Sequence, residues 1–367
     1  MYVNKREKIP NILNILIRGP NWVGDAVLAI PAMKAVRARF ADAEITLLVR
    51  PWVAGLFTSA PFVDKVWSEA KPSCLADWIR VTREIRNRRF DLALLLPNSF
   101  ESALMIFAGR VPQRIGYATD GRQWMLTNPV ATASQSRHQV HYYLDLVKAL
   151  SATADRPSIA IEATSDERST ARRLLAAEGI PHDAPFLVLN PGAAYGSAKR
   201  WHENQFANVA DSLARELGLH VAIIGSEGER GIASQICERM TTATAVLNGK
   251  TSLETLIGVL AESSLMITND SGPMHIAAAL GVSTVAIFGS TDETVTGPYG
   301  PRTRVVKHAV ECSPCLLREC PIDHRCMTRV TVDDVYRAAR ELLGGEIRGQ
   351  TSEFPFSCTT ENGNSPV

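Results

Sequence analysis

Hydrophobic residues in the first half of the chain occur in short continuous runs, each linked to a stretch with helical periodicity. The runs are NILNILIRG, EITLLV, DKVW and DLALLL, and the helical patterns cover residues 25–40, 76–88 and about 99–109. Apolar runs without polar alternation are typical of strands that are buried on both faces of a parallel sheet. The alternation of strand and helix therefore predicts a doubly wound α/β domain.

The same alternation restarts in the second half, after a lapse between about residues 151 and 185. The runs FLVLN, HVAIIG, SLMIT and VSTVAIFG are typical of strands, and one helical pattern covers residues 203–217. A last helical stretch, residues 332–343, could pack against either half. We therefore predict two α/β domains, over residues 1–168 and 169–345, with a ligand cleft between the carboxyl ends of their strands.

Composition excludes several classes of protein. The chain has 367 residues, 46% hydrophobic and 21% charged, with a formal net charge of +1, which argues against a protein that coats nucleic acid. No apolar run is long enough to cross a bilayer. The N-terminus imitates a signal peptide, but Asn11 and Asn14 interrupt it and no small-residue cleavage site follows, so we expect a cytoplasmic protein. Residues 346–367 are polar and are expected to form a disordered tail.

The segment NPGAAYGSAKRWHENQF, residues 190–206, follows a predicted strand and opens a predicted helix. Gly192 and Gly196 allow the backbone to come close to a ligand, and Lys199 and Arg200 add positive charge. Free amide groups at such a junction favour an anion. The alternative is an ordinary turn with solvated basic side chains. No GxxxxGKS motif is present, which argues against a P-loop NTPase.

The segment NDSGPMH makes a second strand–helix junction of this kind at residues 269–275. Asp270 or Ser271 could simply cap the helix, and proline is common in a first helical turn. Capping does not explain His275 together with the polar residues before Gly272. A second anion site is therefore the sharper interpretation.

Asp25 lies at the start of the first predicted helix, within RGPNWVGDAVLAIPAMKAVR. Taken alone, it is best explained as an acid that the helix dipole stabilises. The functional alternative is a general base that faces the cleft, which requires burial or a hydrogen bond to the accepting hydroxyl.

Four segments together resemble one known family. They are NWVGDAVLAIPAMKA, PGAAYGSAKRWHENQFA, NDSGPMHIAAALGVSTVAIFGSTDETVTGPYG and CSPCLLRECPIDHRCM, in that order within residues 14–343. The chain resembles the ADP-heptose–lipopolysaccharide heptosyltransferases of glycosyltransferase family 9, and the last segment resembles the type II branch. This resemblance implies the GT-B fold, in which two Rossmann-like domains face each other across a cleft. It also implies an inverting transfer of L-glycero-D-manno-heptose.

The resemblance further implies roles for individual residues. Asp25 matches the catalytic base and Lys199 the lysine that holds the donor diphosphate, with Ala194 and Tyr195 in the neighbouring loop positions. Asp270 matches the acid near the heptose hydroxyls, and either Glu227 or Glu229 is expected to meet the ribose. The start of the diphosphate-binding helix is expected to comprise Ser271, Gly272, Met274 and His275.

The implied substrates are ADP-heptose as donor and the lipid-anchored inner core of lipopolysaccharide as acceptor, with possible peripheral contact at the inner membrane. No cofactor is expected, because Lys199 and helix amides can stabilise the departing ADP in place of a metal. The acceptor should meet positive charge on the first domain, where a basic run comprises Arg80, Arg83, Arg86, Arg88 and Arg89, followed by Arg110, Arg114, Arg122 and Arg137. A solvated helix face is the competing explanation of that run.

Four of the seven cysteines, Cys312, Cys315, Cys320 and Cys326, form the pattern C-x2-C-x4-C-x5-C. Their spacing permits a zinc or iron–sulfur site, although the resemblance brings no metal with it. A compact loop of free thiols near the cleft is the alternative.

Other functions stay open at this point. A related heptosyltransferase with a different acceptor, a GT-B sugar-nucleotide epimerase and a metal-binding interaction module built on the cysteines are the competing hypotheses. A dehydrogenase is disfavoured, because the first strand–helix turn has the sequence RGPNWVGDA in place of G-x-G-x-x-G. Nucleic-acid binding is disfavoured too, since stacking aromatics are not interleaved with the basic residues.

Overall fold

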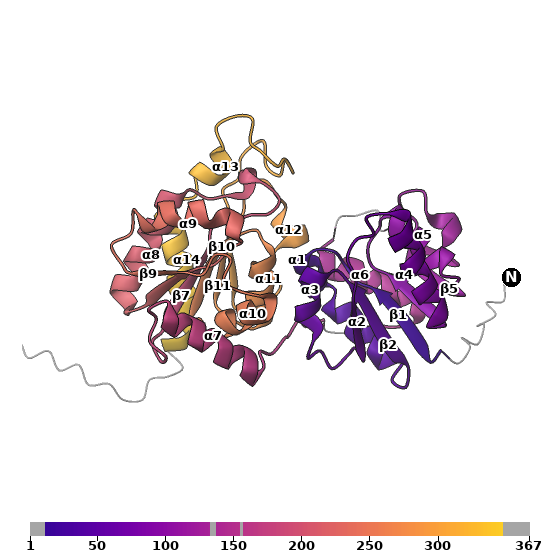
Figure 1. Ribbon diagram of the computed structural model, residues 1–367. Helices are drawn as coiled ribbons and strands as arrows, with labels where there is room; N and C mark the ends of the chain where they lie inside the picture. The colour runs from indigo at the N-terminus through magenta and orange to yellow at the C-terminus, as the bar shows by residue number, and fades with distance from the viewer. Residues whose placement is uncertain (1–11, 133–136, 155–156, 348–367) are drawn as a thin grey trace, which may run out of the picture.

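The computed structural model describes residues 12–132, 137–154 and 157–347. This part of the chain forms two adjacent α/β domains, each built on a parallel six-stranded sheet with helices around it (Figure 1). The predicted class, two doubly wound domains of the GT-B type, is confirmed. Among the described helices, none is both long and apolar enough to span a membrane.

The N-terminal sheet has the strand order β3-β2-β1-β4-β5-β6. Its strands are β1 (Asn14–Arg18), β2 (Glu44–Val49), β3 (Lys65–Ser68), β4 (Leu92–Leu95), β5 (Gln113–Tyr117) and β6 (Asn128–Val130). β1 pairs in parallel with β2 on one side and with β4 on the other, so the order of strands reverses at β1. Such a reversal leaves a crevice at the carboxyl ends of the strands, where ligands bind.

The C-terminal sheet repeats this arrangement with the order β12-β11-β10-β7-β8-β9. Its strands are β7 (Phe186–Asn190), β8 (His220–Ile223), β9 (Thr244–Val246), β10 (Leu265–Asn269), β11 (Thr284–Ile287) and β12 (Thr303–Val306). The reversal lies between β7 and β10, the strands that precede the two polar segments. Every residue of these two strands is buried, as their continuous apolar runs predict.

Helices surround both sheets (Figure 1). The N-terminal domain contains α1 (Val23–Leu28), α2 (Ile30–Arg39), α3 (Pro51–Ala54), α4 (Leu75–Asn87), α5 (Phe100–Ala108) and α6 (Gln139–Val147). The rest of the chain adds α7 (Ser165–Ala177), α8 (Glu203–Leu217), α9 (Arg230–Cys237), α10 (Leu253–Glu262), α11 (Gly272–Ala279), α12 (Glu293–Thr296), α13 (Arg325–Thr328) and α14 (Val332–Ile347). α14 packs on α8 and on β10, β11 and β12, so it belongs to the C-terminal domain. It extends two residues into the expected tail, and residues 348–367 lie outside the described part.

The single helix predicted over residues 25–40 is two helices. α1 ends at Leu28 and α2 begins at Ile30, with Pro31 in the first turn of α2. Proline has no amide hydrogen, and its ring crowds the carbonyl of the preceding turn, so the two segments do not form one continuous helix. The break leaves α1 as a short separate helix with Asp25 in its first turn.

α7 was missed by the periodicity of the sequence. A capping box starts it, in which Thr164 accepts from the Glu167 amide and the Glu167 carboxylate accepts from the Thr164 amide. The predicted domain boundary at residue 168 falls inside this helix. Because α7 packs extensively on α10, we propose that the C-terminal domain begins before Thr164.

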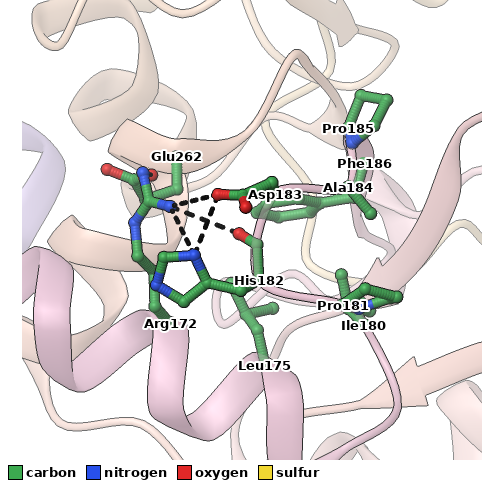
Figure 2. A pocket seen from close by; sticks show the side chains of 10 residues that line it. All are labelled: Arg172, Leu175, Ile180, Pro181, His182, Asp183, Ala184, Pro185, Phe186 and Glu262. Carbon is green, nitrogen blue, oxygen red and sulfur yellow. Dashed lines mark hydrogen bonds and ion pairs between the residues drawn. The ribbon is translucent and has the colours of Figure 1, made fainter.

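A small hollow of about 230 Å³ lies beside α7, and charged side chains that link α7 to its neighbours line it (Figure 2). Arg172 forms an ion pair with Glu262 of α10 and lies 3.6 Å from the Asp183 carboxylate. Arg168 reaches the same Glu262 at 2.5 Å. None of the predicted site residues lines this hollow, and its charged groups fasten α7 to α10.

The two domains meet where α1 packs against α11. Two glycines permit the close approach: a Cβ on Gly24 would lie 2.7 Å from His275 Cδ2, and one on Gly272 would lie 3.3 Å from a side chain of α1. A second bridge joins His138 Nε2, at the start of α6, to the Gly297 carbonyl oxygen at 3.0 Å. These contacts place the carboxyl ends of the two sheets on opposite sides of one cleft.

We predict that Gly258→Ala lowers the free energy of unfolding by about 1–3 kcal/mol, measured by urea denaturation. A Cβ at Gly258 would lie 2.2 Å from the Glu167 carbonyl oxygen, so α7 and α10 would have to separate. Gly231→Ala in α9 is the control, because a Cβ at this position would meet nothing within 4 Å. This substitution should raise the free energy of unfolding by about 1 kcal/mol, since alanine favours a helix over glycine. Equal effects of the two changes would contradict the close helix contact.

Candidate functional site

A cleft of about 870 Å³ lies between the domains. The first turn of α1 borders it on one side, and the loops after β7, β8, β10 and β11 border it on the other. Nine residues expected at the site line this cleft, namely Asp25, Ala194, Tyr195, Lys199, Glu229, Asp270, Ser271, Gly272 and His275. The fold therefore brings together residues from four separate strand ends.

Lys199 and Asp270 form an ion pair on the C-terminal side of the cleft. Lys199 Nζ donates to Asp270 Oδ2 at 2.6 Å, and the Thr291 hydroxyl donates to the same oxygen at 2.7 Å. Their side chains are 14% and 6% exposed. The lysine follows β7 and the acid follows β10, two paired strands, so they meet where the strand order reverses. Pairing offsets part of the cost of burying both charges.

The N-terminus of α11 opens into the same part of the cleft. Ser271 is its N-cap residue, but no side chain caps the helix. The Ser271 hydroxyl accepts instead from Asn190 Nδ2 at 2.7 Å and lies 3.1 Å from the Thr268 hydroxyl. The capping explanation of Asp270 and Ser271 is therefore wrong. The first amides of α11 and the helix dipole favour an anion at this position.

Asp25 approaches this anion site from the other domain. Burial raises the pKa of its carboxyl to about 6, Asp270 acts in the same direction, and Lys199 opposes the shift. A carboxylate that merely capped α1 would have a lowered pKa, because helix amides stabilise the charged form. The raised pKa favours the general-base interpretation, since a carboxyl that titrates near neutrality is suited to accept a proton.

The two candidate acids after β8 lie in different surroundings. Glu229 lines the cleft, and its Oε2 accepts from the amide of Ser226 at 2.8 Å and from its hydroxyl at 2.7 Å. A Cβ on Gly192 would lie 2.1 Å from Glu229 Oε1, so this glycine makes room for the carboxylate. Glu227 pairs with Arg230 at 2.8 Å and is absent from the described lining. Of the two acids, Glu229 is the one in position to reach a ligand.

His275 and Met274 have different access to the cleft. Burial lowers the pKa of His275 to about 4, so its imidazole is neutral at pH 7. Its Nδ1 is buried and has no hydrogen-bond partner among the described residues. Met274 was expected at the site, but its side chain is fully buried against Ala286 and Phe288 and does not reach the cleft. The backbone of Met274 is the part that remains available.

The cysteine-rich segment packs on the loop that carries Lys199. The Ala198 amide donates to the Arg318 carbonyl, and the Tyr195 hydroxyl donates to the Leu316 carbonyl, both at 2.9 Å. The thiols of Cys312, Cys315, Cys320 and Cys326 are free. In the described ranges no three His, Cys, Asp or Glu side chains are arranged to hold a metal ion. The segment acts here as a brace for the Lys199 loop.

Several arginines of the basic run form ion pairs or hydrogen bonds with other residues of the N-terminal domain. Arg80 pairs with Glu69 at 2.6 Å, and Arg88 pairs with Glu84 at 2.8 Å. Arg122 is fully buried and donates to backbone carbonyls, including that of Tyr117 at 2.9 Å. These contacts favour a structural explanation of the three side chains over contact with an acceptor.

Sequence reasoning missed Thr291 and Asn190. Thr291 follows β11, the strand next to β10, and its position at the carboxyl end of a strand was the available signal. Asn190 is the last residue of β7 and orients Ser271 across the paired strand ends. Both residues lie inside segments named above, but their roles depend on the strand order, which the sequence alone does not give.

Comparisons with known proteins agree on one family. The model of glycosyltransferase family 9 (heptosyltransferase) matches residues 78–325. The chain is 30% identical over 338 residues to lipooligosaccharide heptosyltransferase 2 of Campylobacter jejuni, with 90% of this chain and 98% of that protein covered. It is 29% identical over 315 residues to lipopolysaccharide heptosyltransferase 2 of Escherichia coli, with 80% and 88% covered.

A solved structure shows the same architecture. The structure of E. coli ADP-heptose LPS heptosyltransferase II superposes with a TM-score of 0.79 at 25% sequence identity. The superposition covers 91% of this chain and 100% of that one. At this coverage the likeness extends over both domains.

We predict that Asp25→Asn stabilises the protein increasingly as pH rises from about 4 to about 6. The raised pKa means that the folded protein binds the Asp25 proton more tightly than the unfolded chain, so wild-type stability falls as pH rises through this range. The variant does not titrate there and should gain about 2–3 kcal/mol relative to wild type by pH 7, measured by denaturation across pH.

Asp211→Asn supplies the control of opposite sign. Burial acts to raise the pKa of Asp211, but hydrogen bonds from Thr241 and Thr242 outweigh burial and lower this pKa. Wild type should therefore gain stability relative to Asp211→Asn as pH rises. A pH-independent difference between Asp25→Asn and wild type would contradict the burial of Asp25.

Proposed function

The chain belongs to glycosyltransferase family 9, the heptosyltransferases, and we propose that it transfers L-glycero-D-manno-heptose from ADP-heptose to the first heptose of the lipopolysaccharide inner core. Its relatives carry the names lipooligosaccharide and lipopolysaccharide heptosyltransferase 2. The observation that carries the proposal is a half-buried carboxyl with a raised pKa, Asp25, opposite a candidate anion site formed by Lys199 and the start of α11. A lipid-anchored acceptor would bring the protein to the cytoplasmic face of the inner membrane.

The donor would bind along the C-terminal side of the cleft. Lys199 and the first amides of α11 would hold the diphosphate, and Asp270 would accept hydrogen bonds from the heptose hydroxyls. Glu229 would accept from the ribose hydroxyls. Beyond it the cleft is lined by three apolar side chains that suit a flat adenine ring, those of Ile224, Leu253 and Leu256.

The proposed reaction is a single displacement. Asp25 takes the proton of the acceptor hydroxyl as that oxygen bonds to the anomeric carbon, and the bond from that carbon to the diphosphate breaks on the opposite face. ADP leaves with the electron pair and gains negative charge, which Lys199 and the α11 amides stabilise. With a pKa of about 6, Asp25 is ionised at neutral pH and still basic enough to accept a proton.

We predict acceptor-dependent release of ADP from ADP-heptose, with a truncated inner-core acceptor that already carries one heptose. The acceptor should gain the mass of one heptose, and a chelator should not prevent the transfer. Asp25→Asn should lower kcat by about 10²–10⁴-fold, because the base is removed, with the Kd for ADP-heptose nearly unchanged. A coupled ADP assay, mass spectrometry and calorimetry supply the three readouts.

Two of the competing functions, the epimerase and the related heptosyltransferase, have their own signatures in this experiment. ADP release or epimer formation without acceptor would support a sugar-nucleotide epimerase. Transfer only to another saccharide would indicate a related heptosyltransferase. Wild-type turnover by the Asp25→Asn variant would remove Asp25 from the mechanism.

Lys199→Ala should weaken ADP-heptose binding or lower kcat by about 10–100-fold, as expected for the loss of one charge-assisted contact to phosphate. Calorimetry and initial rates measure the two quantities separately. Lys65→Ala is the control, because Lys65 pairs with Glu44 at 2.8 Å on the exposed surface of the N-terminal domain and does not line the cleft. Equal behaviour of the two variants would exclude Lys199 from the diphosphate site.

A further inference from the structure

Two tryptophans border the N-terminal side of the cleft beside Asp25. Trp22 is 65% exposed and Trp52 is 56% exposed, and both line the cleft together with Val23 and Leu28. Exposed aromatic side chains at the rim of a cavity are typical of ligand contacts, because covering their large apolar faces with a ligand removes them from water and is favourable in free energy.

Hydrogen bonds join the Trp52 indole to Asn21, the residue that precedes Trp22. Trp52 Nε1 donates to the Asn21 carbonyl oxygen at 2.8 Å, and Arg18 Nη2 donates to Asn21 Oδ1 at 2.5 Å. Arg18 ends β1 and Trp52 lies in α3 after β2, the strand that pairs with β1. Trp22 immediately follows Asn21 and precedes Asp25 by three residues. Both tryptophans therefore lie at the same sheet edge as the proposed base, and the Trp52 indole is fixed there by its hydrogen bond.

The residues proposed to bind ADP-heptose lie on the opposite wall of the cleft. The two tryptophans therefore have no role in the proposed binding of the donor. On the described N-terminal wall, Asp25 is the ionisable side chain among Trp22, Val23, Leu28 and Trp52. An apolar surface beside one carboxylate suits a sugar ring. The C–H groups of such a ring form an apolar face, while its hydroxyls project from the edge toward polar partners.

We propose that Trp22 and Trp52 form a stacking platform for the acceptor sugar and hold its reactive hydroxyl against Asp25. This inference rests on the proposed function and deepens it by assigning the acceptor subsite. The two tryptophans are positioning residues, because they contact the sugar face and take no part in proton transfer.

Positive charge lies behind the platform. Arg50, which precedes α3, is 8% exposed, and its Nη2 lies 3.9 Å from the Glu101 carboxylate, beyond hydrogen-bond distance. Arg18 is 5% exposed, and burial together with neighbouring Arg50 lowers its pKa to about 10. The carboxylates near these two buried cations are Glu101 and Glu69, and Glu69 is already paired with Arg80, so a positive potential remains at this wall. The platform therefore suits an acidic or phosphorylated saccharide.

The test compares W22A, W52A and the double variant with W22F and W52F. The alanine variants should raise the acceptor KM about tenfold each and further in combination, with the Kd for ADP-heptose unchanged. The phenylalanine variants should retain most of the acceptor affinity, because a ring remains for stacking. W124A is the matched control: Trp124 is 59% exposed on the same domain, packs edge-to-face on Phe107 with the ring centroids 5.4 Å apart, and does not line the cleft.

Binding of the deacylated acceptor to the D25N protein, followed by calorimetry, gives a readout that does not need turnover. Loss of this binding in W22A and W52A, but not in W124A, supports the platform even if the wild type transfers to another acceptor or not at all. Unchanged acceptor binding and KM in the double variant would overturn it. A matching loss of ADP-heptose affinity would assign the indoles to the donor, and an effect confined to acylated acceptor in vesicles would assign them to lipid. Either result would overturn the proposal while leaving the transfer reaction intact.

Discussion

The close contact of α1 with α11 is the constraint on which the site depends. Gly24 lies against His275, and Gly272 lies against the first turn of α1, so no side chain at these positions separates the two helices. The next residue, Asp25, is thereby brought into the electrostatic reach of Lys199 and Asp270 on the other domain. Without this contact each domain would contain only half of the proposed site. The N-terminal domain would hold the proposed base, and the C-terminal domain would hold the proposed anion site.

The charges that meet in the cleft are coupled. Asp270 already accepts from Lys199 and Thr291, so the lysine only partly offsets the burial of Asp25. A diphosphate that arrives at Lys199 adds negative charge near Asp25, and negative charge raises the proton affinity of a carboxyl. The proposed base would therefore be stronger in the donor complex than in the free protein. Binding of the donor thus prepares the group that acts on the acceptor.

Much of the fold and the position of the site could be predicted from local patterns. Continuous apolar runs identified β7 and β10, and the polar residues at their ends identified the anion site. α7 was missed because its start is marked by a hydrogen-bonded capping box at Thr164, which hydrophobic periodicity does not detect. Tertiary contacts decided the rest. Glu227 and Glu229 share one local sequence, but Glu229 lies beside Gly192 in the cleft, whereas Glu227 lies beside Gly249 and pairs with Arg230.

Glu229 is ordered before any ligand arrives. Ser226 holds its Oε2 with two hydrogen bonds, and the Gly192 backbone confines its other oxygen. Immobilising a free glutamate side chain costs about 1.5–2 kcal/mol of rotamer entropy, and here that cost falls on folding and not on binding. In the proposed donor complex the nucleoside end of the cleft would therefore be a rigid template. The sugar-phosphate end would differ, because Lys199 would have to share its ammonium between Asp270 and an incoming phosphate, so adaptation on binding would be concentrated there.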